Sequence, residues 1–140
     1  MKIAIGCDHG GIALKEEIVA LLKELGQEID DRGCHSTESV DYPEFAKMVC
    51  GEVQSGAADR GILICGTGIG MSMVANRFDG IRAALCHELF TARMSREHND
   101  ANVLCLGARV VGPGLAVEIV RTWIGTEFAG GRHLKRIRMF

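Results

Sequence analysis

Short apolar runs alternate with longer amphipathic segments along the whole 140-residue chain. The runs predict strands at 2–5, 28–31, 61–65, 81–86 and 103–106, the second of them a weak edge strand. The amphipathic segments predict helices at 12–25, 44–55, 70–77, 89–97 and 114–124. Strands that alternate with helices form parallel sheets with helices on both faces. We therefore expect one domain over residues 1–140, a three-layer α/β/α sandwich around a five-stranded, Rossmann-like parallel sheet. The residues alone favour the strand order 2-1-3-4-5.

The charge balance and hydropathy argue against two classes of partner. The chain has 16 Lys and Arg and 18 Asp and Glu, and its net charge of -2 gives no general affinity for nucleic acid or a membrane surface. The apolar run at the first residues is too short for a signal peptide, and the longest uncharged stretch, 61–76, is too short to span a bilayer. We expect a cytoplasmic protein.

The six cysteines are scattered and never form a C-x-x-C pair. In a chain with no secretion signal, such a set indicates reduced thiols rather than disulfides. Zinc-ligand spacing is absent as well. The sequence therefore predicts neither a metal nor a disulfide framework.

The segment GILICGTGIGMSM at 61–73 places Cys65 where a strand gives way to a helix. Glycines at Gly66, Gly68 and Gly70 leave backbone N–H groups open to an oxyanion or phosphate. The spacing is not that of dinucleotide-binding loops, and no P-loop lysine follows, so the ligand should be smaller than a dinucleotide. The alternative is a buried core cysteine followed by a tight turn without a ligand.

Ligands of such sheets bind beyond the carboxyl ends of the strands, where the winding direction reverses. The loops after the first and third strands meet there, so Asp8 and His9 should lie near Cys65. Each has a simpler explanation: Asp8 as a helix N-cap and His9 as a surface loop residue.

His98 and Asn99 lie between the fourth helix and the fifth strand, where a polar helix end is the simpler interpretation. A segment that enters a parallel strand is at the opposite edge of the sheet, about 15 Å from the loops that leave strands. If His98 acts with Cys65, a second protomer must supply it, and the protein is at least a homodimer.

In the basic tail, Arg132 and Arg136 would share one face of a helical turn and could bind one phosphate, although a solvated tail is the default interpretation.

Six segments together resemble the type B ribose 5-phosphate isomerases, which include galactose and allose 6-phosphate isomerases. They are CDHGG at 7–11, ESVDYPEFA at 38–46, GILICGTGIGMS at 61–72, ANRFDGIRAA at 75–84, SREHNDANVLCLGARVVG at 95–112 and GGRH at 130–133. The resemblance implies a sugar-phosphate isomerase without metal or cofactor and a sheet order of 2-1-3-5-4. It also implies a homodimer, in some members a tetramer, with active sites shared between protomers.

The resemblance assigns a role to each matching residue. Cys65 corresponds to the base that moves a proton between C1 and C2, and His98 to the acid/base that opens the sugar ring. Asp8 and Asn99 correspond to contacts with sugar hydroxyls. The anion hole corresponds to Thr67 with the backbone of Gly66, Gly68, Ile69 and Gly70. Phosphate and sugar contacts correspond to His9, Arg109, Arg132 and Arg136. Another branch of the family has a Glu base at the position of Met71, which cannot accept a proton.

Three functions are therefore open. The first is the interconversion of ribose 5-phosphate and ribulose 5-phosphate in the pentose phosphate pathway. The second is isomerisation of allose 6-phosphate or galactose 6-phosphate on the same scaffold. The third is a phosphosugar-binding protein without catalysis.

Overall fold

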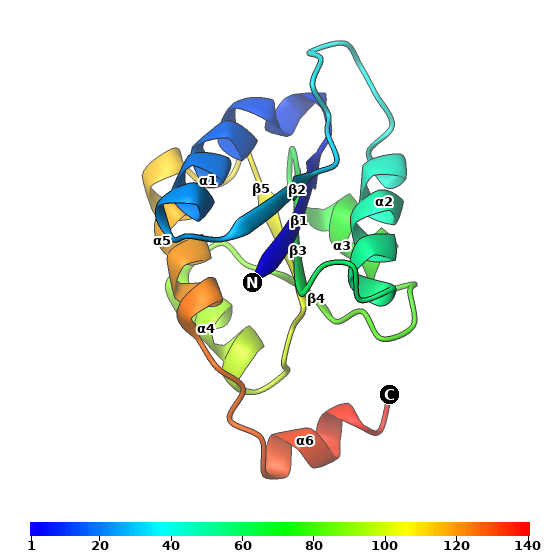
Figure 1. Ribbon diagram of the computed structural model, residues 1–140, viewed down its shortest axis with the longest axis vertical. Helices are drawn as coiled ribbons and strands as arrows, with labels where there is room; N and C mark the ends of the chain where they lie inside the picture. The colour runs from blue at the N-terminus through cyan, green and yellow to red at the C-terminus, as the bar shows by residue number, and fades with distance from the viewer.

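Five parallel strands form one sheet in the order β2-β1-β3-β5-β4 in the computed structural model, which describes residues 1–140 (Figure 1). The strands are β1 (Lys2–Cys7), β2 (Glu28–Asp31), β3 (Arg60–Cys65), β4 (Ala83–Leu85) and β5 (Val103–Gly107). The order 2-1-3-5-4 is confirmed, and the order 2-1-3-4-5 expected from the residues alone is wrong. Burial explains the difference: all five residues of β5 are buried, whereas the three residues of β4 are only half-buried. A strand buried on both faces belongs inside a parallel sheet, and a short, part-exposed strand belongs at its edge.

Helices cover both faces of the sheet, so the structure is a three-layer sandwich (Figure 1). One face carries α1 (Ile12–Glu24), α4 (Leu89–Glu97) and α5 (Pro113–Gly125), and the other carries α2 (Tyr42–Gln54) and α3 (Ile69–Ala75). The short 3-10 helix η1 (His9–Gly11) leads into α1. The last helix, α6 (Arg132–Ile137), lies outside the layers beneath the edge of the sheet where strands begin, while the loop 32–41 lies at the opposite edge (Figure 1).

Most predicted elements are present with small shifts at their ends. The strand at 28–31 and the helix at 89–97 have their predicted bounds. The helix predicted from residue 44 begins at Tyr42, because Pro43 fits the first turn, where no N–H donor is needed. The strand predicted at 81–86 shortens to Ala83–Leu85, because the N–H of Arg82 bonds to the side chain of Asn102 instead of extending a strand ladder.

Alternation along β3 decides where Cys65 points. Side chains on a strand project to opposite faces in turn. Ile62 and Ile64 belong to the core under α1 and α5, whereas Leu63 and Cys65 belong to the core under α2 and α3. The sulfur of Cys65 therefore lies on the α3 side, at the carboxyl end of its strand.

Candidate active site

The loop after β3 folds around the sulfur of Cys65. The backbone N–H of Gly68 donates to Sγ over 3.2 Å, and the Cys65 side chain is 5% exposed. Gly68 makes this contact from the left-handed region, with φ at +76°. A hydrogen bond from an N–H to sulfur is stronger when the sulfur carries negative charge. The loop thus places a backbone donor directly on this sulfur.

Two of the three glycines after Cys65, Gly68 and Gly70, also have a steric reason to be there, whereas a Cβ at Gly66 would make only ordinary van der Waals contacts. A Cβ at Gly68 would lie 2.5 Å from Cδ1 of Leu85, and one at Gly70 would lie 2.6 Å from the ring of Tyr42. A Cβ at Gly66 would meet Arg109 atoms at 3.5 to 3.7 Å. Close packing in a tight turn therefore accounts for glycine at Gly68 and Gly70, and the same turn is compatible with an anion-binding loop.

Thr67 and the first turn of α3 supply further polar groups. The hydroxyl of Thr67 accepts a hydrogen bond from the N–H of Ile69 at 3.3 Å. The first hydrogen bond of the helix runs from the N–H of Ser72 to the carbonyl of Gly68 at 3.0 Å. The N–H groups of Gly70 and Met71 precede that bond and so have no partner within the helix. Gly70 is half-buried and can offer its N–H near the Cys65 loop, whereas Met71 is fully buried.

Asp8 and His9 follow β1, the neighbour of β3, and the N–H of Asp8 bonds to the carbonyl of Ile64 at 3.1 Å. Asp8 is the N-cap of η1, because its Oδ1 accepts from the N–H of Gly10 at 2.9 Å. Nδ1 of His9 accepts from the N–H of Val40 at 3.2 Å, which leaves its proton on Nε2. His9 is therefore fixed by the loop 32–41 with one donor nitrogen to spare.

Arg109 connects the two loops. Its guanidinium lies beside Gly66, and Nη2 would be 3.8 Å from a Cβ at Gly10. We define the carboxyl-edge cluster as the candidate residues that meet here: Asp8, His9, Cys65, Gly66, Thr67, Gly68, Ile69, Gly70 and Arg109.

The other candidates, together with His133, form a second group, the amino-edge cluster, which comprises His98, Asn99, Arg132, His133 and Arg136. His98 ends α4, and its ring stacks on that of His133 with centroids 4.1 Å apart and planes 7° from parallel. Because α6 is helical, Arg132 and Arg136 lie one turn apart, as predicted, and both are exposed. The basic tail is thus an ordered element beside His98.

One chain does not bring the two clusters together. β3 and β5 pair from Gly61 with Val103 at the amino edge to Cys65 with Gly107 at the carboxyl edge. Four residue steps along a strand separate these edges, about 13 Å. The amino-edge cluster lies beyond the start of β5, so His98 and Cys65 of one chain are at opposite edges, as the sequence indicated.

Four of the remaining thiols are poor candidates for proton transfer. Burial raises the pKa of Cys7 to about 11 and that of Cys50 to about 12. Burial likewise raises the pKa of Cys86 and, further, that of Cys105. No group of three His, Cys, Asp or Glu side chains is placed to hold a metal ion. None of the helices has both the length and the apolar character needed to cross a membrane.

Comparison with known proteins matches nearly the whole chain to one family of proteins. Residues 3–140 match the family model described as Ribose/Galactose Isomerase. The chain belongs to the ribose/galactose isomerase family. It is 56% identical over 138 residues to a putative sugar phosphate isomerase of Bacillus subtilis (strain 168), covering 98% of this chain and 93% of the relative. It is 54% identical over 136 residues to the ribose-5-phosphate isomerase B of Escherichia coli (strain K12), covering 97% and 91%. The solved ribose-5-phosphate isomerase B of Clostridium thermocellum superposes with a TM-score of 0.98 at 58% identity, covering 99% of this chain and 94% of that one.

His133 is the residue of this family member that sequence reasoning missed. It is 9% exposed, since it lies against His98, and the sequence signal was its place between two arginines of the tail, Arg132 and Arg136. Burial lowers the pKa of His133, and the charges of His98, Arg132 and Arg136 lower it further, while Glu97 opposes them. The surroundings of His133 thus disfavour protonation of its imidazole beside the stacked ring of His98.

Substitution of Gly68 tests the loop. Gly68→Ala meets left-handed strain of roughly 1 to 2 kcal/mol, and the clash with Leu85 adds roughly 1 to 3 kcal/mol. We expect a lower melting temperature and loss of activity. Gly80→Ala is the matched control, because Gly80 has the same φ of +76° with no atom within 4 Å of its Cβ position. It should lose only the strain energy and keep its activity, and equal effects of the two variants would contradict this role of the loop.

An NMR titration of the histidine ring protons tests the environment of His133. We expect its pKa below the ordinary 6.5. Because the unfolded chain then binds the proton more readily, the free energy of unfolding should fall as the pH drops from 6.5 towards the folded-state pKa. His133→Asn should lack that part of the pH dependence in urea denaturation. A pKa above 6.5 for His133 would refute the stacked, desolvated environment.

Proposed function

We propose that the chain interconverts ribose 5-phosphate and ribulose 5-phosphate through a cis-enediolate, with Cys65 as the base. One observation carries the proposal: the N–H of Gly68 donates to Sγ of Cys65 at the carboxyl end of β3. The chain that makes this contact belongs to a family of sugar isomerases. The similarity to the Escherichia coli ribose-5-phosphate isomerase B supports the choice of substrate. All six cysteines are free, which supports a reducing compartment, the cytoplasm.

The carboxyl-edge cluster suits the proton transfer. The Cys65 thiolate takes the proton from C2 of the open-chain aldose, a C1–C2 double bond forms, and the carbonyl electron pair moves to O1. Return of the proton to C1, with protonation of O1 and loss of the O2 proton, gives the ketose. Thr67 and the N–H groups at the start of α3 would stabilise the negative charge on O1, which is absent from the bound aldose and develops in the transition state and the enediolate. Asp8 would contact a sugar hydroxyl with the carboxylate oxygen that does not cap η1.

The amino-edge cluster suits the other two tasks. Ribose 5-phosphate is mostly a closed ring, and an imidazole such as His98 can both donate and accept the protons that open it. Arg132 and Arg136 would bind the phosphate with His9 and Arg109, and Asn99 would contact the sugar. These groups serve Cys65 only if a partner's amino edge covers the carboxyl edge. The proposal therefore includes a homodimer with shared active sites, which two such dimers could extend to a tetramer.

A hexose 6-phosphate is the second candidate substrate, because the family description covers galactose as well as ribose isomerases. The loop 32–41 holds His9 through Val40, so its position sets how much room a longer sugar would find. A phosphosugar-binding protein without catalysis is the third possibility. It would bind ribose 5-phosphate and form no product.

One assay series separates these functions. The purified chain is followed by NMR with ribose, allose and galactose phosphates, and kcat/KM is compared among them. We expect the highest value for ribose 5-phosphate and a loss of about 10²- to 10⁴-fold in kcat in Cys65→Ala. Cys50→Ala is the matched control, since this buried thiol packs in the same core and is far from ionising. Unchanged turnover in Cys65→Ala would refute the base, and a preferred hexose phosphate would refute the substrate.

A further inference from the structure

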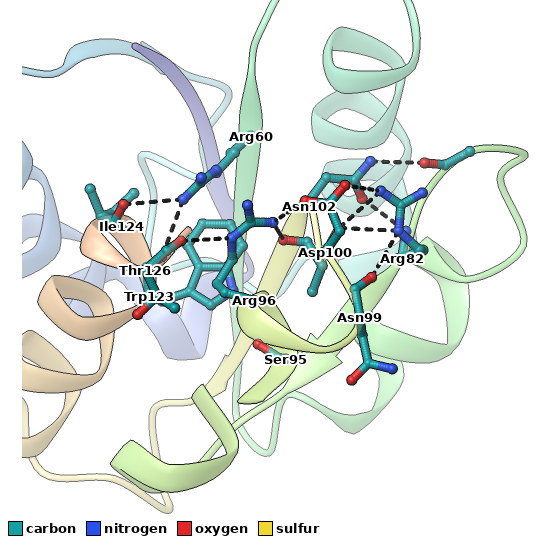
Figure 2. A network of polar contacts seen from close by, with 12 residues as sticks. Arg60, Arg82, Ser95, Arg96, Asn99, Asp100, Asn102, Trp123, Ile124 and Thr126 are labelled. Atoms are coloured by element: carbon teal, nitrogen blue, oxygen red, sulfur yellow. Dashed lines mark hydrogen bonds and ion pairs between the residues drawn. The ribbon is translucent and has the colours of Figure 1, made fainter. Parts of the chain in front are cut away.

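The polar contacts around the end of α4 converge on Asp100, the residue after His98 and Asn99 (Figure 2). Its Oδ1 lies 2.9 Å from Nη1 of Arg96, and its Oδ2 lies 3.0 Å from Nη2 of Arg82. One carboxylate thus joins two guanidinium groups from different segments. The resemblance to known isomerases gave Asp100 no role, and neither proposed cluster includes it.

The backbone of Asp100 is unusual in the same place. It is the one residue other than glycine with positive φ, at +46°, and its N–H donates to the carbonyl of Arg96 at 3.1 Å. This is the left-handed helix end that glycine usually forms. Asp and Asn tolerate the conformation better than other side chains do, at a cost of roughly 1 to 2 kcal/mol. A glycine would avoid this cost, so the carboxylate here points to a use for the side chain.

Arg82 binds the backbone at Asn99 and Asp100, directly after His98. Its guanidinium donates to the carbonyl of Asn99 at 3.0 Å and to that of Asp100 at 3.1 and 2.9 Å (Figure 2). Asn102 fixes Arg82 in turn, because its Oδ1 accepts the Arg82 N–H at 2.8 Å while its Nδ2 donates to Gly80. The end of α4 is therefore tied to the segment before β4.

Arg96 ties the same loop to the protein core. It is 4% exposed, and it donates to the carbonyls of Ala101 at 2.6 Å and Thr126 at 3.3 Å. Its guanidinium lies 5.8 Å from the ring centre of the fully buried Trp123. A buried cation that loses its carboxylate is strongly unfavourable, so Arg96 and Asp100 hold each other in place.

We propose that Asp100 is a positioning residue for the isomerase reaction, which through Arg82 and Arg96 fixes the His98 ring against His133 and sets the direction of Asn99. His98 and Asn99 lie directly before it on a helix end, where a chain otherwise frays. The effect of Asp100 on turnover rests on the proposed function, because the placement of His98 matters for turnover only if His98 opens the sugar ring. The placement itself can be measured without any substrate.

Two substitutions separate the carboxylate from the turn. Asp100→Asn keeps the shape and the tolerance for positive φ but removes the charge. Asp100→Gly relieves the backbone strain, so it should fold even where the polar network is lost. Asp79→Asn is the matched control, because Asp79 is exposed on a nearby loop, makes no side-chain hydrogen bond or ion pair, and changes the net charge equally.

Two readouts are needed. By NMR, the ring signals of His98 and His133 should shift or broaden in both Asp100 variants and stay unchanged in Asp79→Asn. With ribose 5-phosphate, kcat should fall by about 10²-fold in both Asp100 variants, the effect of a misplacement of about 1 Å. Asp79→Asn should retain wild-type kcat.

The outcomes separate this proposal from the proposed function. Wild-type chain that isomerises no sugar phosphate, with His98 signals that move in the variants, would refute the function and support the placement. Active variants with wild-type kcat would refute the positioning role, whether or not the histidine signals move. Unmoved signals together with reduced kcat would refute it as well, because Asp100 would then act other than through His98.

Discussion

The direction of parallel strands decides where every candidate side chain of this chain lies. The residue that follows a parallel strand lies at one edge of the sheet, and the residue that precedes a strand lies at the other edge. Cys65 and Asp8 come after strands and lie at the carboxyl edge, whereas His98 comes before β5 and lies at the amino edge. No change of side-chain rotamer can cross the length of a strand. The separation therefore makes a second copy of the chain part of any mechanism that uses both clusters.

The two clusters are built in different ways. At the carboxyl edge, glycines allow backbone and ring atoms to approach within contact distance, so that Gly68 reaches the sulfur of Cys65. At the amino edge, side chains do the fixing: His133 stacks on His98, and Asp100 joins Arg82 to Arg96. A loop of backbone donors suits a transient oxyanion. A rigid set of imidazoles and exposed arginines suits ring opening and a phosphate.

Local patterns predicted the elements and the meeting of Asp8 and His9 with the Cys65 loop, whereas Thr67 and Arg109 were assigned only through the family resemblance. The bounds of β2 and α4 follow from hydrophobic periodicity, and the meeting of Asp8 with the Cys65 loop follows from the sheet. The exchange of β4 and β5 did not follow from the residues, because it depends on which strand the helices bury on both faces. The stacking of His133 and the bridging by Asp100 involve partners that local patterns cannot pair, since Arg82 is 18 residues from Asp100. The positive φ of Asp100 was equally out of reach, because a non-glycine residue there depends on contacts that only the folded chain makes.

Activity of mixed dimers tests the shared site most directly. Chains with Cys65→Ala and chains with His98→Asn are co-expressed with different tags, and the mixed dimer is purified beside the two parent dimers. If each site takes Cys65 from one protomer and His98 from the other, the mixed dimer has one intact site. It should show about half of the wild-type activity on ribose 5-phosphate, while both parents are inactive. A mixed dimer as inactive as its parents would contradict the account, because it would place Cys65 and His98 of the same chain in one site.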